Sequence, residues 1–155
     1  SKPGIYREFG SDDGLKVAVL ELYRTLVLLP LYDILAKDQL FDKTLEDLIC
    51  YAVQDREALA VPDGCLFVAM RARREELGDG ARERLDQLRS ECLKNYEECI
   101  DRAKASKGFG PDVPTEIAAL YFDAQNSNAM RLQKEGVSNS VISDVLKLAF
   151  RVFRQ

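Results

Sequence analysis

The residues that could carry chemistry in this 155-residue chain are carboxylates, arginines, tyrosines and cysteines, because the sequence contains no histidine. That absence removes the commonest general base, the usual partner of a Ser or Cys nucleophile and the imidazole ligand of most metal sites. The sequence also lacks a Gly-rich phosphate loop, an EF-hand loop, zinc-ligand spacing and a nucleophile elbow. We therefore assign no catalytic residue, no metal ligand and no cofactor from the sequence.

The best candidate for a ligand site contains Glu21 and Arg24, which lie three residues apart on one face of a predicted helix. A partly buried ion pair is costly unless partners satisfy it, and nearby tyrosines or Asp123 could do so. An arginine beside tyrosines in an apolar cleft can hold an acidic ligand. The alternative is that Glu21 and Arg24 form a solvent-facing edge. The candidate cleft comprises Glu21, Tyr23, Arg24, Tyr51 and Tyr121.

The four cysteines, Cys50, Cys65, Cys92 and Cys99, show no C-x-x-C spacing. This pattern favours reduced, mostly buried thiols in an intracellular, reducing compartment. Cys92 and Cys99 lie about 10.5 Å apart along one helix face, so they cannot form a disulfide with each other. A redox role would need Cys50 or Cys65 alongside them; the alternative is that the cysteines pack as small apolar side chains.

The element that must position these residues runs from Leu15 to Ala36 and reads LKVAVLELYRTLVLLPLYDILA. Its second half is apolar on all sides, which predicts a helix enclosed by other helices. Its charged residues leave no uncharged run near the roughly eighteen residues that a membrane-spanning helix requires. Pro30 lacks a backbone N–H, so the helix must kink, or end and restart, at that point. A kink would free backbone acceptors and mark a pocket or hinge at Leu26–Tyr32.

Apolar residues recur at steps of three and four in five further stretches, which predicts helices over 42–60, 65–77, 81–106, 115–136 and 141–154. Gly78-Asp79-Gly80 predicts a corner or, alternatively, a bend in one long rod. Lys107–Pro114 predicts a loop in which Phe109 either plugs the core or faces outward. The sequence thus predicts an N-terminal arm over 1–10 and a single-domain all-α bundle over 11–155. This bundle has about six helices around a buried central helix, residues 12–36, broken near Pro30.

The helix predicted over 115–136 has an unusual middle. Its apolar spacing predicts five inward residues, Ile117, Leu120, Tyr121, Ala124 and Leu132. Residues 125–128 (Gln-Asn-Ser-Asn) then compete with the helix for backbone hydrogen bonds. Such a conflict is expected at a functional or strained site. We therefore predict that Gln125, Asn126 and Asn128 bind a partner; the alternatives are a break in the helix or a merely exposed run.

The last predicted helix is apolar over most of its surface, so it must dock into its own bundle or into a partner. Lys147, Arg151 and Arg154 form a basic strip along it, although the helix dipole alone favours bases there. The candidate partner-binding residues on this helix are Lys147, Phe150, Arg151 and Arg154. The leading hypothesis is a non-catalytic protein–protein interaction module, such as an adaptor, assembly factor or subunit, that presents a helical face to another protein.

Two other classes remain open. The first is a small-molecule binder or carboxylate-based enzyme with a cleft near Tyr23, Arg24, Tyr51 and Tyr121. The second is nucleic-acid binding through Arg71–Arg74 or the basic last helix. The net charge of −4 disfavours the second class, because phosphate-backbone binding normally requires a basic domain. Glu75 and Glu76, which directly follow the arginines, also disfavour it.

Overall fold

The computed structural model describes residue 4 and residues 12–54 and 66–154. Over those residues the chain is helical and contains no strand, which confirms the all-α class. The elements are α2 (Asp12–Tyr23), the π-helical turn η1 (Arg24–Leu28), α3 (Leu29–Ala36), α4 (Phe41–Ala52), α5 (Leu66–Ala72), the 3-10 turn η2 (Arg74–Glu76), α6 (Asp79–Ala105), α7 (Thr115–Lys134), α8 (Asn139–Phe150) and the 3-10 turn η3 (Arg151–Phe153). The predicted N-terminal arm, apart from Gly4, and residues 55–65 lie outside the described residues.

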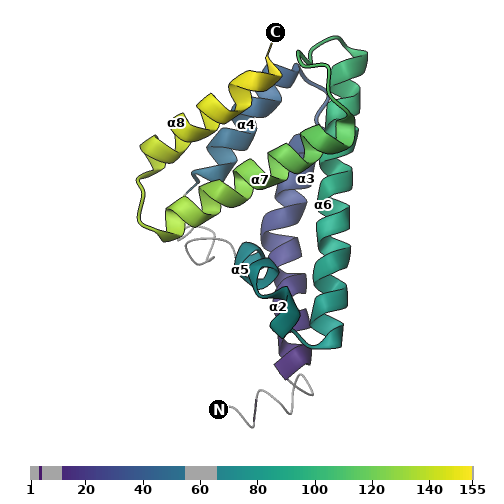
Figure 1. The fold of residues 1–155 in the computed structure, drawn as a ribbon, viewed down its shortest axis with the longest axis vertical. Helices are drawn as coiled ribbons and strands as arrows, with labels where there is room; N and C mark the ends of the chain where they lie inside the picture. The colour runs from purple at the N-terminus through teal and green to yellow at the C-terminus, as the bar shows by residue number, and fades with distance from the viewer. Residues whose placement is uncertain (1–3, 5–11, 55–65, 155) are drawn as a thin grey trace.

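One long rod and one long helix run side by side through the molecule (Figure 1). The rod consists of α2, η1 and α3, which follow one another without interruption, and its neighbour is α6. Pro30 is the second residue of α3 and cannot donate to the preceding turn. The backbone N–H of Leu29 bonds to the carbonyl of Arg24, five residues back, so the turn before Pro30 is widened. The break predicted near Pro30 takes the form of this widened turn.

The N-terminus of α6 is capped by a residue from another helix. The Asp13 carboxylate accepts hydrogen bonds from the backbone N–H of Gly80 at 3.1 Å and of Ala81 at 2.9 Å. This places a negative charge at the positive end of the α6 dipole. A Cβ atom at Gly78 or Gly80 would lie 2.5 Å or 2.6 Å from the same carboxylate. The predicted corner at Gly78-Asp79-Gly80 is therefore present, and its glycines allow Asp13 to approach.

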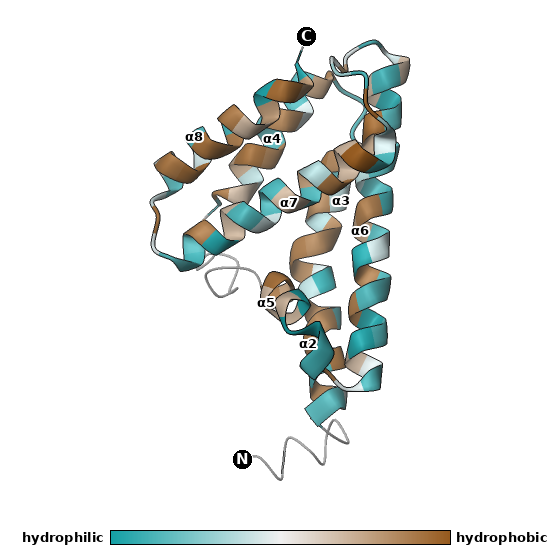
Figure 2. Ribbon diagram, in the orientation of Figure 1, coloured by the Kyte–Doolittle hydropathy of each residue, from teal (hydrophilic) through white to brown (hydrophobic). Residues whose placement is uncertain are grey.

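Aromatic rings fill the space where α4, α7, α8 and the loop after α6 meet. Phe122 is 1% exposed, and its ring stacks on Phe153 with centroids 4.4 Å apart. The Phe150 ring lies 5.0 Å from Phe122. Phe109 is buried against Phe41 and Phe153, so it plugs the core. The last helix thus docks into its own bundle. Some of the apolar residues of α8, which are brown in Figure 2, nevertheless remain exposed.

The inward face of α7 differs from the predicted one. Ile117 is 55% exposed and Leu120 is 43% exposed, although both were predicted to face inward. The buried residues of α7 are Ala118, Ala119, Phe122, Asp123 and Ala129. Small alanines allow α7 to pack closely against its neighbours, so the helix is rotated by about one residue from the prediction. This rotation carries Asp123 into the interior.

Replacing Phe122 by Ala tests the aromatic core. We expect Phe122→Ala to lower the free energy of unfolding by about 3–5 kcal/mol, because it removes a fully buried ring and leaves a cavity. Urea unfolding followed by circular dichroism measures this change. The control, Leu148→Ala on the exposed face of α8, should stay within about 0.5 kcal/mol of the unsubstituted protein. Equal stabilities for the two variants would contradict the described core.

Candidate functional site

A partly open cavity of about 60 Å³ lies between the rod, α4, α5, α6 and α7. Most of its wall is apolar. Its aromatic members are Tyr23, Tyr51, Phe67 and Tyr96, and its main polar members are Arg71, Asp123, Asn126 and Ser127. We call this space the aromatic cavity. An apolar enclosure with a few converging polar groups is the usual form of a small-molecule site.

The charged part of the cavity wall is an ion pair between α5 and α7. The Arg71 guanidinium donates to both carboxylate oxygens of Asp123, Nη1 to Oδ1 at 3.1 Å and Nη2 to Oδ2 at 2.8 Å. The Asp123 side chain is 11% exposed and that of Arg71 is 22% exposed. A buried carboxylate is costly unless a cation or several donors satisfy it. Arg71 supplies that partner.

The same guanidinium also lies against an aromatic face. Arg71 Cζ is 5.6 Å from the centroid of the Phe67 ring, within the range of a cation–π contact. The Phe67 ring in turn stacks on Tyr23, with centroids 5.7 Å apart and planes 14° apart. A cation therefore already occupies the space between a buried carboxylate and two stacked rings.

The remaining polar groups of the wall are neutral hydrogen-bonding groups. The Tyr51 hydroxyl donates to the backbone oxygen of Val27, in the widened turn, at 2.6 Å. Asn126 Nδ2 donates to the Tyr96 hydroxyl at 2.5 Å. Burial raises the pKa of Tyr96 well above its ordinary value, so this hydroxyl stays protonated. Among the residues that the structure describes, Arg71 and Asp123 are thus the only Arg, Lys, Asp or Glu side chains in the cavity wall.

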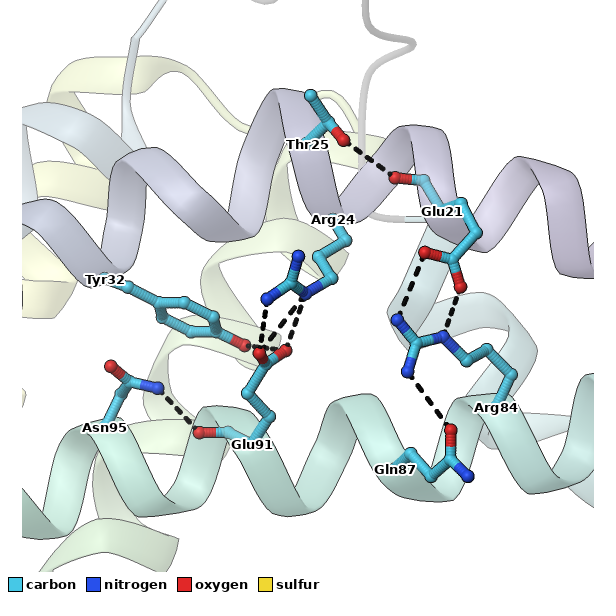
Figure 3. A network of polar contacts seen from close by, with 8 residues as sticks. All are labelled: Glu21, Arg24, Thr25, Tyr32, Arg84, Gln87, Glu91 and Asn95. Carbon is cyan, nitrogen blue, oxygen red and sulfur yellow. Dashed lines mark hydrogen bonds and ion pairs between the residues drawn. The ribbon is translucent and has the colours of Figure 1, made fainter.

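The structure separates the five residues of the predicted cleft. Tyr23 and Tyr51 line the aromatic cavity. Glu21 and Arg24 lie instead on the face of the rod that meets α6 (Figure 3). Tyr121 points toward α8, where its hydroxyl donates to the backbone oxygen of Ala149 at 2.8 Å. Glu21, Arg24 and Tyr121 are therefore structural contacts outside the cavity wall.

Two arginine–carboxylate pairs connect the rod to α6 (Figure 3). Arg24 Nη2 lies 2.6 Å from Glu91 Oε1, and its Nε lies 3.0 Å from Oε2. The Tyr32 hydroxyl donates to the same carboxylate at 3.4 Å. The second pair, Arg84 with Glu21, is more exposed. Hydrogen bonding to Arg24 lowers the pKa of the Glu91 carboxyl, so Glu91 stays ionised and the pair holds the two helices together.

The predicted partner-binding residues occupy different surroundings. Asn126 lines the cavity and bonds to Tyr96, so it faces inward. Asn128 accepts from Arg131 at 2.7 Å along the surface of α7, and Gln125 is half-buried beside it. The helix continues through this stretch without the break that was one alternative.

Phe150, one of the predicted partner-binding residues of the last helix, belongs to the core of the bundle. Its side chain is 1% exposed, because the apolar face of α8 packs on α4 and α7. Lys147 and Arg151 are exposed, and Arg154 Nε lies 3.5 Å from Asp42 Oδ1. These three bases border an open groove between α4 and α8, together with the exposed Cys50.

The arginines of the predicted nucleic-acid patch are paired with carboxylates. These pairs are Arg71 with Asp123, Arg73 with Glu76, and Arg74 with Asp86 and Glu75. Among the described residues, this patch therefore offers little uncompensated positive charge to a phosphate backbone.

Cys92 and Cys99 are buried on the inward stripe of α6, and Cys92 borders the cavity. Burial raises the pKa of Cys99 to about 11, which keeps it as a neutral thiol. Cys65 lies outside the described residues. Within the described part of the chain, no cluster of three or more Cys, Asp or Glu side chains is arranged to hold a metal ion.

Sequence reasoning missed Arg71 and Asp123 as cavity residues. The sequence placed Arg71 in a candidate nucleic-acid patch and offered Asp123 only as a possible partner of Glu21 or Arg24. The one available signal was the polar stretch at residues 125–128, which does mark the part of α7 that borders the cavity. It was interpreted as facing outward, because a single sequence does not fix the rotation of α7.

These features define an all-α bundle with an internal, mostly apolar cavity. A solved structure of the same fold is the crystal structure of NemR from E. coli in its reduced form. It aligns with a TM-score of 0.73 over 100% of this chain and 81% of that chain, at 16% sequence identity. At this identity the likeness shows the fold alone. No protein-family model and no curated protein sequence matches the chain.

The comparisons give no support to the adaptor or assembly-factor hypothesis. In the described part of the chain, no helix is long and apolar enough to cross a membrane.

The Arg24–Glu91 pair predicts a pH-dependent contribution to stability. The pKa of Glu91 in the folded protein lies below its ordinary value of 4.5. The stabilisation from the ionised Glu91 carboxylate is therefore complete above pH 4.5 and is lost as the pH falls through the pKa of the folded state. We expect Glu91→Gln to cost about 1 kcal/mol at pH 7. The difference in the free energy of unfolding between Glu91→Gln and the unsubstituted protein should shrink as falling pH protonates Glu91.

Urea unfolding at a series of pH values measures this effect. Glu98→Gln, at an exposed position of the same helix, is the matched control and should be neutral at every pH. A Glu91→Gln cost that does not change between neutral and acidic pH would contradict the role given to this carboxylate.

Proposed function

We propose that the protein binds a small molecule in the aromatic cavity. The observation that carries this proposal is the convergence of four aromatic side chains and one partly buried ion pair on a largely apolar, partly open space. A core built only for stability is normally filled to high density by apolar side chains. Here the interior holds both an unfilled volume and a charged pair, which together favour ligand recognition.

The size of the cavity restricts the ligand. About 60 Å³ holds several water molecules, whereas a cavity that accommodates benzene measures about 150 Å³. A ligand larger than a few atoms therefore requires a side chain to move. Arg71 is the best candidate, because it also lines a neighbouring open groove between α5 and α6. Its guanidinium can turn toward solvent in that groove, which enlarges the cavity.

The π-helical turn supports the same location. Such widened turns occur frequently at functional sites, and Val27 and Leu28 of this turn line the cavity. The hydrogen bond from the Tyr51 hydroxyl to the Val27 backbone oxygen also holds α4 against the rod at this turn. The rod, α4, α6 and α7 thus hold most of the cavity wall, and the short α5 is its fifth element.

Ligand binding is tested with toluene, benzyl alcohol, benzylamine and benzoate, observed by saturation-transfer NMR and titration calorimetry. Ala52→Leu adds three carbon atoms to the cavity wall and should weaken binding by about tenfold or more. Ala124→Leu makes the same change at an exposed position of α7 and should leave binding unchanged.

Circular dichroism and thermal unfolding establish that both leucine variants are folded. The proposal is contradicted if no probe binds saturably, or if Ala52→Leu binds every probe as well as Ala124→Leu does.

A second candidate function is contact with another protein through the outer face of α8. Val141, Leu148 and Val152 are 49%, 64% and 54% exposed, and their spacing places them on one side of the helix. Exposed apolar side chains grouped in this way favour an interaction surface. Removal of the whole helix is unsuitable as a test, because it would also remove Phe150 and Phe153 from the core.

The point variant Leu148→Glu tests this surface without disturbing the core. If the surface binds a protein, Leu148→Glu should abolish self-association in sedimentation or the capture of a partner, while thermal stability is unchanged. Identical sedimentation and identical capture for the variant and the unsubstituted protein would contradict this role.

A further inference from the structure

We propose that the aromatic cavity selects small organic cations, which displace the Arg71 guanidinium and pair with Asp123. This inference rests on the proposed function and specifies the chemical class of its ligand. It follows from three observations: what surrounds Asp123, what Arg71 can do when displaced, and which rings face the vacated position.

The first observation is the fixed position of Asp123. It lies in the middle of the twenty-residue α7, it is 8% exposed, and it is surrounded by helices on the cavity side. Because the aspartate side chain is short, its carboxylate stays close to this buried position on α7. Whenever Arg71 leaves, this buried negative charge must gain another cation or strong hydrogen-bond donors.

The second observation is the freedom of Arg71. It belongs to the last turn of the seven-residue α5 and lines both the cavity and the open groove bordered by Arg74, Asp86 and Arg89. A long arginine side chain keeps its charge hydrated once it turns into that groove. The two partners of the ion pair are therefore unequal, because the arginine side chain can reach the open groove while the aspartate stays buried.

The third observation is the aromatic surface beside the carboxylate. The Phe67 ring already faces the Arg71 guanidinium at 5.6 Å and is backed by the stacked Tyr23 ring. Tyr51 and Tyr96 complete the aromatic lining. A carboxylate beside an aromatic face is complementary to an ammonium group on an apolar body, through charge pairing and cation–π attraction together.

These observations also decide against the opposite ligand charge. An anion could pair with Arg71, but it would then lie next to Asp123 and leave that carboxylate unpaired. A neutral ligand of the same shape would leave the carboxylate without a cation if Arg71 moved. A cationic ligand supplies the positive charge that the Arg71 guanidinium takes away, so the net charge of the cavity does not change.

The test compares benzylamine with its neutral isostere benzyl alcohol and with benzoate, by titration calorimetry at pH 7. We expect benzylamine to bind about tenfold more tightly than benzyl alcohol, and benzoate to bind most weakly. Arg71→Met removes the competing cation while keeping an unbranched, flexible side chain. It should strengthen benzylamine binding by about tenfold and leave benzyl alcohol nearly unchanged.

Asp123→Asn keeps the shape of the carboxylate and should abolish the preference for benzylamine. Because each variant leaves one charged side chain without its partner, the comparison of the three probes on the unsubstituted protein provides the measurement that does not depend on how either variant folds. Equal affinities for the three probes, or weaker benzylamine binding by Arg71→Met, would overturn the inference about ligand charge while small-molecule binding itself would stand. Failure of every probe to bind would instead contradict the proposed function.

Discussion

The structure depends on a constraint at Pro30, which cannot donate a backbone hydrogen bond inside the most apolar helix of the chain. The rod accommodates this loss by widening one turn, Arg24–Leu28, rather than by ending. That turn provides Val27 and Leu28 to the cavity wall and a backbone oxygen to the Tyr51 hydroxyl. The apolar central helix is therefore both the scaffold of the bundle and one side of its internal space.

Charged pairs have different roles in different parts of the molecule. Arg24 and Glu91, each with a side chain 32% exposed, connect two long helices at their boundary with solvent. Removing either partner there leaves a charge that water can still reach, so the cost is modest. Arg71 and Asp123 are more buried and unequal in mobility, because one lies on a seven-residue helix and the other on a twenty-residue helix. This inequality makes the pair a candidate for exchange with a ligand.

The all-α class and the approximate course of most helices could be predicted because apolar spacing determines which segments are helical and which ones are buried. Tyr23 and Tyr51 could also be assigned to an apolar cleft. The rotation of α7 could not be predicted, since Ile117 and Leu120 are as apolar as the residues that it buries. The partners of Glu21, Arg24 and Arg71 lie far away in sequence, and only the fold identifies them. The capping role of Asp13 also depends on the fold, because its carboxylate caps α6, which lies far away in sequence.

The most direct test of ligand binding in the aromatic cavity is a crystal structure of the protein with benzylamine. We expect the ammonium group within hydrogen-bonding distance of the Asp123 carboxylate, the ring against Phe67 and Tyr23, and the Arg71 side chain turned into the outer groove. An intact Arg71–Asp123 pair around an unchanged cavity, with benzylamine absent or bound elsewhere, would contradict this account.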